Sequence, residues 1–407
     1  MREVAIISGA RTPVGKFGGV FKDIAAVELG SIAIKAAIKR AGIDNDLIED
    51  VIMGAIHQEG MGNNPCRIAA LKAGIPHSSG ALTVNNICSS GMKAVEIAAH
   101  QIQLGINDVA IAGGMESNSQ CPFMMLGMRW GNRLGNKQVV DALYYDGFTD
   151  IHGVYGNYFH VGETAENIVR DSKIICKKYE IPQIVLGFEE INQFALESHL
   201  KYQKAKKEGF FKEIAPVEVI NKNERRVISE DESPREDVTL EKLNHLKPVF
   251  REGGFVTAGN TPNLNDGAAA VLLMSSEKAE ELNLTPLGIW KDCAMGNVEP
   301  YYMGIGPIVA IRNLISKNSL KLDDIDIFEI NEAQAQQVLF CIKGLGINEK
   351  KVNVNGGAIA IGHPPGMTGT RLILTALHEL KRKKLNRVIC SQCAGGGTGM
   401  ATLLERY

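Results

Sequence analysis

Two stretches of this chain, far apart in sequence, repeat the same order of local structure. Residues 83–114 (TVNNICSSGMKAVEIAAHQIQLGINDVAIAGG) run from a strand through a turn, a helix and an Asn/Asp turn to a second strand that ends in glycines. Residues 353–397 run in the same order and also end in glycines. A shared order of elements indicates internal duplication. Two similar halves packed together would bring their strand ends and glycine-rich loops to one shared cleft.

The hydrophobic pattern of both halves predicts strands that alternate with helices. Short apolar runs predict buried strands, and longer stretches with helical spacing predict helices. Strands alternating with helices favour βαβ units and a sheet covered on its faces, so the predicted fold class is α/β. The strands are predicted at Val4–Ile7, Val51–Met53, Leu82–Val84, Val109–Ala112, Ala268–Met274, Leu287–Ala294, Asp326–Ile330 and Val388–Cys393, and the helices at Ile24–Arg40, Gly91–Leu104, Gly306–Ile315, Ala333–Leu345 and Gly369–Arg382.

The middle of the chain has a different character. It is rich in Met, Tyr and charged residues, with irregular segments expected at 127–137 and 221–237. Helices are predicted there at Thr164–Lys178 and Phe188–Lys207. We therefore expect three regions: an N-terminal half of residues 1–116, continued at 251–274; a loop domain inserted at 117–250; and a C-terminal half of residues 275–407.

The composition excludes several classes of protein. The 407 residues carry 44 Lys+Arg against 46 Asp+Glu, a net charge of −2, which gives no electrostatic reason to expect nucleic acid or an anionic membrane as a partner. No apolar run approaches the ~20 residues of a membrane span. Eight cysteines are too few for a disulfide scaffold, and we expect no secretory signal. The expected protein is cytoplasmic, with free thiols.

Cys88 is the first candidate for chemistry. It lies in NNICSSG, between a predicted strand and a predicted helix, so it stands near a helix N-terminus. Free N–H groups and the positive end of the helix dipole favour a thiolate there, and they could also stabilise a developing oxyanion. The alternative is a cysteine buried as a small hydrophobic residue, and the local sequence leaves both open.

Two polar residues of the second half stand in equally suggestive loops. His363 lies in GGAIAIGHPPG, a Gly/Pro loop in the segment that mirrors Cys88. A histidine there can act as a base toward a thiol or as a donor to an oxyanion, although a lone histidine is more often structural. Asn331, in NEA after a predicted strand, either caps a helix or holds a substrate oxygen or a water.

Cys393 is the last candidate, in CAGGGTG at the end of a predicted strand. The glycines after it, Gly395 among them, let the backbone approach a ligand closely. Cys390 completes a C-x-x-C spacing that suits zinc or a redox pair. However, residues three apart on a strand face opposite sides, and the chain has no second C-x-x-C. We therefore expect no metal.

Taken together and in order, these segments resemble the thiolase family, most closely its acetyl-CoA acetyltransferase (acetoacetyl-CoA thiolase) branch. The resemblance spans the chain, from Arg11-Thr12-Pro13 through VNNICSSG, HVGETAEN, TAGNTPNLNDGAAA, NEA, GGAIAIGHPPG and CAGGGTG. It implies the thiolase fold, with duplicated βαβαβαββ halves in a five-layered α-β-α-β-α core and an inserted loop domain. It also implies a homodimer or homotetramer, with tetramer contacts expected in Gly127–Lys137.

The resemblance implies an acyl-CoA:acetyl-CoA C-acyltransferase. Its reaction would be the reversible Claisen condensation of two acetyl-CoA to acetoacetyl-CoA plus CoA. Coenzyme A would be substrate and product, with no tightly bound cofactor. Cys88 would be the acyl-accepting nucleophile, and His363 would activate it and donate to a first oxyanion site with a water held by Asn331. Cys393 would be the acid/base, and the N–H groups of Cys88 and Gly395 a second oxyanion site.

Five further residues match positions that line the CoA tunnel or the acyl pocket of the family. They are His160, Arg235, Phe250, Ala258 and Met303. The chain departs from the family pattern near them. Thr261-Pro262 replaces an expected serine, Gln334 replaces a phenylalanine, Met367 and Thr368 stand where Ala and Ser are usual, and extra residues lie around His152–Asn157. These departures bear on the acyl chain that the protein accepts.

Four other functions stay open. A broader-chain 3-ketoacyl-CoA thiolase would share the catalytic set. A carrier-protein ketoacyl synthase or a decarboxylating condensing enzyme of this fold would carry His or Asn in place of Cys393. A non-catalytic CoA-binding subunit would bind CoA without turnover. A metal or redox protein would use Cys390 with Cys393.

Overall fold

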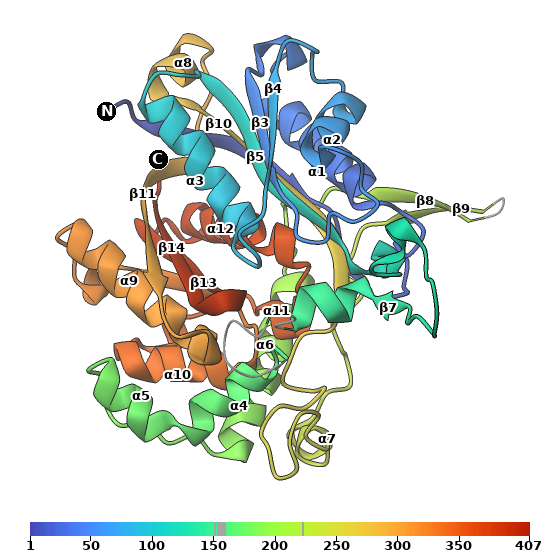
Figure 1. The fold of residues 1–407 in the computed structure, drawn as a ribbon. Coiled ribbons are helices and arrows are strands. Elements are labelled where there is room, and N and C mark those ends of the chain that lie inside the picture. The colour runs from blue at the N-terminus through green and yellow to red at the C-terminus, as the bar shows by residue number, and fades with distance from the viewer. Residues whose placement is uncertain (150–151, 153–159, 222–223) are drawn as a thin grey trace.

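The core is an α/β sandwich in which two sheet layers alternate with three helix layers (Figure 1). The computed structural model describes residues 1–149, 152, 160–221 and 224–407. Within these ranges, hydrogen bonds join ten strands into one sheet. Its two halves meet where β1 pairs with β11 over three residue pairs, and each half forms one of the sheet layers.

The pairing pattern of the first half is repeated in the second. In the first half, β4, β3 and β5 are parallel, and β10 and β1 follow as antiparallel neighbours. In the second, β12 and β13 are parallel, and β14 and β11 follow as antiparallel neighbours. The predicted duplication is therefore confirmed. The bounds are β1 (Val4–Arg11), β3 (Asp50–Gly54), β4 (Gly80–Val84), β5 (Val109–Ser117), β10 (Asn265–Ser275), β11 (Gly288–Asn297), β12 (Ile327–Ile330), β13 (Arg387–Ala394) and β14 (Thr398–Glu405).

Two helices form the middle layer. They are α3 (Ser90–Gln103) and α12 (Pro365–Lys383), which pack against each other. α3 also packs on β5 and β3, and α12 packs on β5, β10 and β13. They approach closely, because a Cβ on Gly91 would lie 2.7 Å from the carbonyl oxygen of Gly366. Outside, α1 (Ala26–Ala41) and α2 (Pro65–Ala73) cover the first half, and α9 (Gly306–Lys317) covers the second, with α10 (Ala335–Leu345) beside it. The buried apolar core divides into three clusters between these layers.

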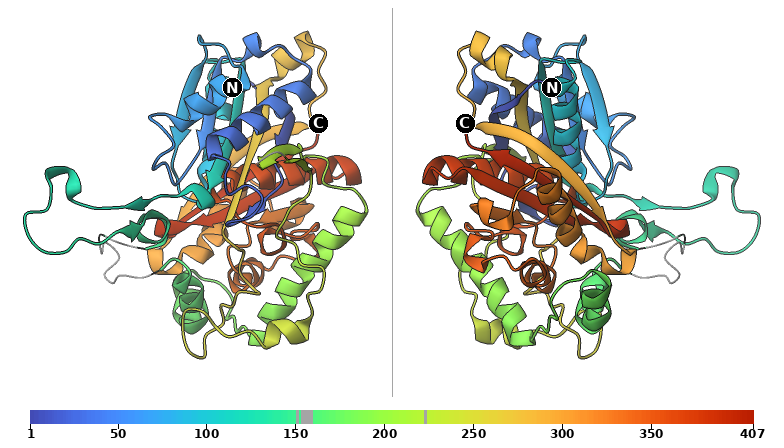
Figure 2. Two further views of the ribbon diagram at one scale, coloured as in Figure 1. Left: turned by 90° about the vertical axis from the view of Figure 1, so that its right-hand side faces the viewer. Right: turned by 90° about the vertical axis from the view of Figure 1, so that its left-hand side faces the viewer.

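The segment between β5 and β10 carries most of the remaining elements. A two-stranded arm of β6 (Phe123–Met124) and β7 (Val140–Asp141) projects from the body (Figure 2). The segment also holds α4 (Glu163–Arg170), α5 (Ser172–Lys178), α6 (Phe188–Lys207), the hairpin β8 (Val217–Asn221) and β9 (Glu224–Ile228), α7 (Leu240–Asn244) and the π-helix η4 (Leu143–Phe148). Short elements elsewhere are β2 (Gly15–Lys16), α8 (Ser276–Glu281) and α11 (Ala358–Ile361). Among the described residues, no helix has the length and apolarity needed to cross a membrane.

Four sequence predictions need correction. The helix predicted at 164–178 is two helices, because Asp171 leaves helical geometry and its carboxylate bonds Arg170 and Tyr302. The irregular segment at 221–237 contains β9, whose exposed, charged sequence has no apolar alternation to indicate a strand. Leu82 is 45% exposed because β4 is the edge strand of its half, so the strand at 82–84 is not buried. β14 was not predicted.

Candidate active site

Cys88 lies on a tight turn between β4 and α3. The N–H of Asn86 donates to Ser90 Oγ (2.8 Å), which in turn donates to the carbonyl of Ile87 (2.6 Å). Ile87 has a left-handed backbone (φ 49°), which is uncommon for a β-branched residue. This turn places Cys88 immediately before the N-terminus of α3, as predicted.

The Cys88 thiol is nevertheless held protonated. Burial raises its pKa to about 11, while the N–H of Gly395 and its own N–H oppose that shift. Backbone N–H groups thus favour the thiolate, as expected, but desolvation outweighs them and the thiol stays protonated. A base is needed before the sulfur can attack, and the contact with the Gly395 N–H brings a donor group to the reacting centre.

His363, which lines a cavity together with Cys88, is a candidate for that base. The backbone N–H of His363 donates to Asn265 Oδ1 (2.9 Å), and this hydrogen bond fixes the backbone of the loop before α12. Its Nδ1 lies 2.7 Å from Thr368 Oγ1, and that hydroxyl donates its own proton to the carbonyl of Pro364 (2.8 Å). Thr368 can therefore only accept from His363, which puts the imidazole proton on Nδ1 and leaves Nε2 with a lone pair.

The surroundings of His363 keep its ring neutral. Burial, and secondarily the positive charge of Arg371, lower its pKa to about 3. A neutral ring with Nε2 unprotonated can accept a proton from a thiol. Nε2 lies 3.5 Å from Asn331 Nδ2, which can donate to it only in this tautomer.

Asn331 is fully buried at the end of β12. Its N–H donates to the carbonyl of Ser391 (2.8 Å). The alternative of a helix cap is wrong, because α10 begins at Ala335 with Gln334 before it. The Asn331 Oδ1 atom is buried and has no hydrogen-bond partner among the described residues. A buried amide oxygen without a partner is suited to hold a water or a substrate donor.

Cys393 lies on β13 with 1% of its surface exposed. Burial raises the pKa of its thiol well above the ordinary value, and the nearby sulfurs of Cys88 and Cys341 act in the same direction. Cys390, three residues earlier, is influenced instead by Glu329 and Arg371. The two cysteines of the C-x-x-C therefore face different surroundings. Neither belongs to a cluster of three potential metal ligands in the part of the chain that the structure describes.

Two adjoining cavities meet at Cys88. The larger, about 470 Å³, is lined by Cys88 and His363 together with the predicted His160, Phe250 and Met303. Within it, His160 stacks on Phe250 with ring centroids 5.0 Å apart. The smaller, about 240 Å³, is lined by Cys88, Gly395 and Met303 among others. Most of the predicted residues thus meet around one sulfur.

Two predicted tunnel residues do not line either cavity. These residues are Arg235 and Ala258. The Arg235 side chain donates to the carbonyl of Ala258 (3.1 Å), so the two residues contact each other outside the walls of both cavities. Pro262 and Gln334 do line the larger cavity, which places the departures from the family pattern at its wall. Of the extra residues 152–157, His152 lines the smaller cavity, and the others lie outside the described residues.

Three site residues were not predicted to act there. Asn265 and Thr368 orient His363 from its two sides, as described above. Glu116 is fully buried at the end of β5, and its carboxylate accepts from the N–H groups of Ile56, His57 and Gly366, at 3.0–3.1 Å. It thereby ties the loop after β3 to the start of α12. No sequence pattern indicated these contacts, because they join residues up to 250 positions apart.

Comparison with known proteins agrees with this arrangement. The model of the thiolase N-terminal domain matches residues 4–277, and that of the thiolase C-terminal domain matches residues 284–406. A probable acetyl-CoA acyltransferase of Staphylococcus aureus (strain NCTC 8325 / PS 47) is 42% identical, with both chains covered completely.

Solved structures give the same result. The crystal structure of the Bacillus anthracis acetyl-CoA acetyltransferase has a TM-score of 0.93 and 41% identity, covering 100% of this chain and 99% of that one. The human mitochondrial 3-ketoacyl-CoA thiolase has a TM-score of 0.92 and 35% identity, with the same coverage. With its family models, relatives and fold in agreement, the chain belongs to the thiolase family.

Proposed function

We propose that this protein is an acetyl-CoA C-acetyltransferase, which condenses two acetyl-CoA to acetoacetyl-CoA plus CoA and catalyses thiolysis in the reverse direction. The observation that carries the proposal is the arrangement at the Cys88 sulfur. A donor N–H of Gly395 contacts it, and a neutral His363 with a free Nε2 lines the same cavity. The names of the relatives support acyl transfer between CoA thioesters.

The first half-reaction transfers the acetyl group to the protein. The Cys88 sulfur attacks the thioester carbonyl while its proton passes to His363 Nε2, and the carbonyl oxygen becomes an oxyanion. When the oxyanion collapses, the bond to the CoA sulfur breaks, and the departing CoA takes the proton of the Cys393 thiol. Cys393 is then a thiolate, and His363 keeps the proton that it took from Cys88. The new thioester on Cys88 is close in energy to the old one, so this step is readily reversible.

The second half-reaction forms the carbon–carbon bond. The Cys393 thiolate removes a proton from the methyl group of a second acetyl-CoA, and the carbanion attacks the acyl carbon on Cys88. The sulfur of Cys88 departs as the leaving group and takes the proton back from His363. Acetoacetyl-CoA then leaves, and both cysteines are thiols again.

Charge develops on two different carbonyl oxygens along this path. The N–H groups of Cys88 and Gly395 would stabilise one, and His363 with a water on Asn331 the other. Loss of one such donor typically costs about 3 kcal/mol of transition-state stabilisation. In this mechanism coenzyme A is substrate and product, and the chemistry calls for no tightly bound cofactor.

The smaller cavity is where the acyl group would lie. It offers about 240 Å³ beside Cys88, between Met303, Ile87 and Phe148. Such a volume holds an acetyl group with room to spare, and the acetoacetyl substrate is favoured by the resemblance to the Bacillus anthracis acetyl-CoA acetyltransferase. A broader-chain 3-ketoacyl-CoA thiolase is the second candidate, because Pro262 and Gln334 alter the wall of the larger cavity. Cys393 argues against the ketoacyl synthases and decarboxylating enzymes of this fold. A dimeric or tetrameric, cytoplasmic protein remains the expectation.

Substrate comparison tests the proposal. Thiolysis of acetoacetyl-CoA and of 3-ketohexanoyl-CoA by free CoA is followed side by side, with Cys88→Ala as the control. We expect fast cleavage of the C4 substrate alone, and none by the variant. Comparable cleavage of both substrates would instead establish the broader-chain thiolase. No cleavage of either by the folded wild type would favour a non-catalytic CoA-binding subunit.

A further inference from the structure

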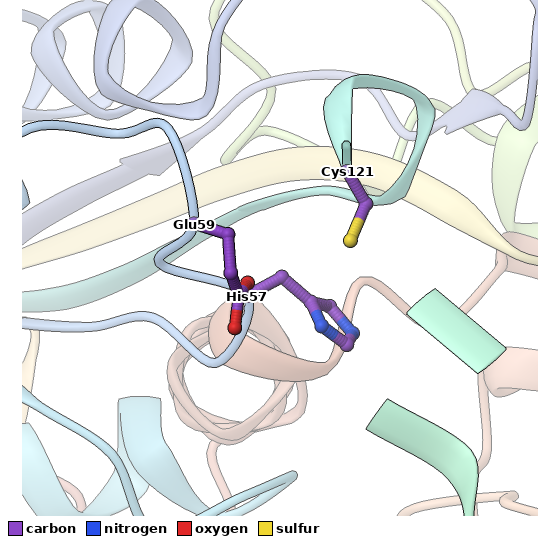
Figure 3. A group of neighbouring side chains, drawn as sticks. All are labelled: His57, Glu59 and Cys121. Carbon is purple, nitrogen blue, oxygen red and sulfur yellow. The ribbon is translucent and has the colours of Figure 1, made fainter. Parts of the chain in front are cut away.

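Three potential metal ligands meet at a point that the proposed mechanism does not use. Donor atoms of His57, Glu59 and Cys121 all lie within 4.8 Å of one another. His57 and Glu59 stand on the loop after β3, and Cys121 on the turn after β5 (Figure 3). The sulfur of Cys121 points toward the other two side chains. Two loops that are distant in sequence therefore bring a nitrogen, an oxygen and a sulfur donor together.

The acidic groups at this point favour a cation. Glu59 Oε2 is buried and has no hydrogen-bond partner among the residues that the structure describes. Burial, together with the nearby carboxyl of Asp146, raises the pKa of this carboxyl group. Two neighbouring carboxylates repel each other, and a proton or a cation relieves that repulsion. Burial, with the carboxylates of Glu59 and Asp141 nearby, also raises the pKa of Cys121 to about 12, a penalty that a bound cation would remove.

We propose that His57, Glu59 and Cys121 bind a divalent transition-metal ion, for which Zn²⁺ is the best match. Zn²⁺ takes imidazole, carboxylate and thiolate ligands at about 2.0–2.3 Å in tetrahedral geometry. Ligand atoms in such a site lie about 3.3–3.8 Å apart, so the cluster contracts by about 1 Å on binding. A water or Asp146 completes the fourth position. Mg²⁺ and Ca²⁺ prefer oxygen ligands and fit this set poorly.

The ion adjoins the acyl cavity. His57 and Asp146 line the smaller cavity together with Cys88, and Gly147 packs directly on the His57 ring. Binding replaces the proton of the Cys121 thiol, which is released to solvent. The ion would thereby fix the loop after β3 and η4 as one wall of that cavity. The sequence analysis predicted no metal site because it weighed only the C-x-x-C spacing of Cys390 and Cys393. His57, Glu59 and Cys121 form no such short motif.

Cobalt spectroscopy tests the ligand set directly. The parent is the full chain with Cys88→Ala, so that the reactive thiol does not compete for metal. Chelator-treated parent is titrated with Co²⁺, whose thiolate charge-transfer band and strong visible bands report a tetrahedral site with sulfur. We expect one Co²⁺ per chain, displaced by Zn²⁺. Adding Cys121→Ala should abolish the charge-transfer band, and adding Glu59→Gln should weaken Zn²⁺ binding at least about tenfold.

A second cluster supplies the matched control. Glu96, His100 and Cys293 also lie within 4.8 Å of one another, but Glu96 already pairs with Lys93 (2.6 Å). Cys293→Ala should therefore keep the band. A band lost with Cys293→Ala and kept with Cys121→Ala would overturn the assignment, as would a parent without any band.

Alkylation of the parent protein tests whether Cys121 binds the ion, without a substitution in any of the three ligands. Saturating Zn²⁺ should protect Cys121 from iodoacetamide, as measured by peptide mass spectrometry. Unchanged labelling of Cys121 under saturating Zn²⁺ would contradict the proposal.

Discussion

Thr368 sets the protonation pattern of His363. Its hydroxyl gives its proton to Pro364 and accepts from Nδ1, so it stabilises the imidazolium that forms when Cys88 is deprotonated. Thr368→Val removes that acceptor and keeps the volume. Hydrogen bonds to charged groups contribute about 1.5–3 kcal/mol, so kcat for thiolysis should fall roughly 10- to 100-fold.

Thr368→Ser is the control, because it keeps the hydroxyl. Its kcat should stay within a few-fold of the wild type, and both variants should unfold at similar denaturant concentrations. Equal kcat values for Thr368→Val and the wild type would show that the hydroxyl does not support the base.

The state of Cys88 predicts a pH dependence. Its pKa is raised to about 11, so the thiolate is a minor species at neutral pH whose fraction grows tenfold for each pH unit. His363, with its pKa near 3, does not form an ion pair with it at rest. The rate of Cys88 alkylation by iodoacetamide should therefore keep rising from pH 7 to pH 10. A plateau reached near pH 7 would indicate a resting thiolate–imidazolium pair instead.

At the scale of elements, activity depends on how closely α3 meets α12. A Cβ on Gly91 would lie 2.7 Å from the Gly366 carbonyl oxygen and 2.8 Å from Thr370 Oγ1, all within the packed core. Gly91→Ala must therefore push the two helices apart, and the N-terminus of α3 carries Cys88 with it. Overpacking of this kind typically costs about 1–3 kcal/mol, so we expect both a lower melting temperature and a lower kcat.

Gly187→Ala is the matched substitution. Gly187 has a φ of −94°, and a Cβ there would meet no atom within 4 Å. The Gly187→Ala protein should have a melting temperature within a degree or two of the wild type and should retain full activity. A Gly91→Ala protein that behaves in the same way would show that the two helices can separate without moving the site.

At the scale of the whole molecule, the edge strand β4 predicts self-association. In the described part of the chain, β4 pairs only with β3, and Leu82 on it is 45% exposed. An exposed apolar edge is ready to pair with a second copy, and a two-fold axis would place the same strand on both sides. Light scattering after size exclusion should give a dimer or tetramer, and Leu82→Asp should shift it toward monomer.

Leu104→Asp serves as the comparison, because Leu104 is 70% exposed but lies at the end of α3 rather than on a sheet edge. It should leave the oligomer intact. A monomeric wild type, or an unchanged mass for Leu82→Asp, would place the interface elsewhere.

The sequence predicted an α/β class with duplicated halves, because duplication and apolar periodicity are local signals that repeat, and the resemblance to the thiolase family implied the five layers. It also singled out Cys88, His363 and Cys393, since each stands in a distinctive glycine-containing motif: NNICSSG, GGAIAIGHPPG and CAGGGTG. It could not predict that Asn265 and Thr368 would hold His363, because such contacts follow from packing. The resting thiol of Cys88 was missed for a similar reason: burial depends on the whole fold, and it outweighed the helix N-terminus that the sequence revealed.

The proposed reaction requires Cys88 to carry the acyl group and Cys393 to move the proton. Intact mass and peptide mapping after incubation with acetyl-CoA test it directly in the Cys393→Ala variant. We predict one acetyl group on Cys88, labile to added CoA, in a protein that makes no acetoacetyl-CoA. An acetyl group on another residue, or acetoacetyl-CoA formed at the wild-type rate without Cys393, would contradict the account.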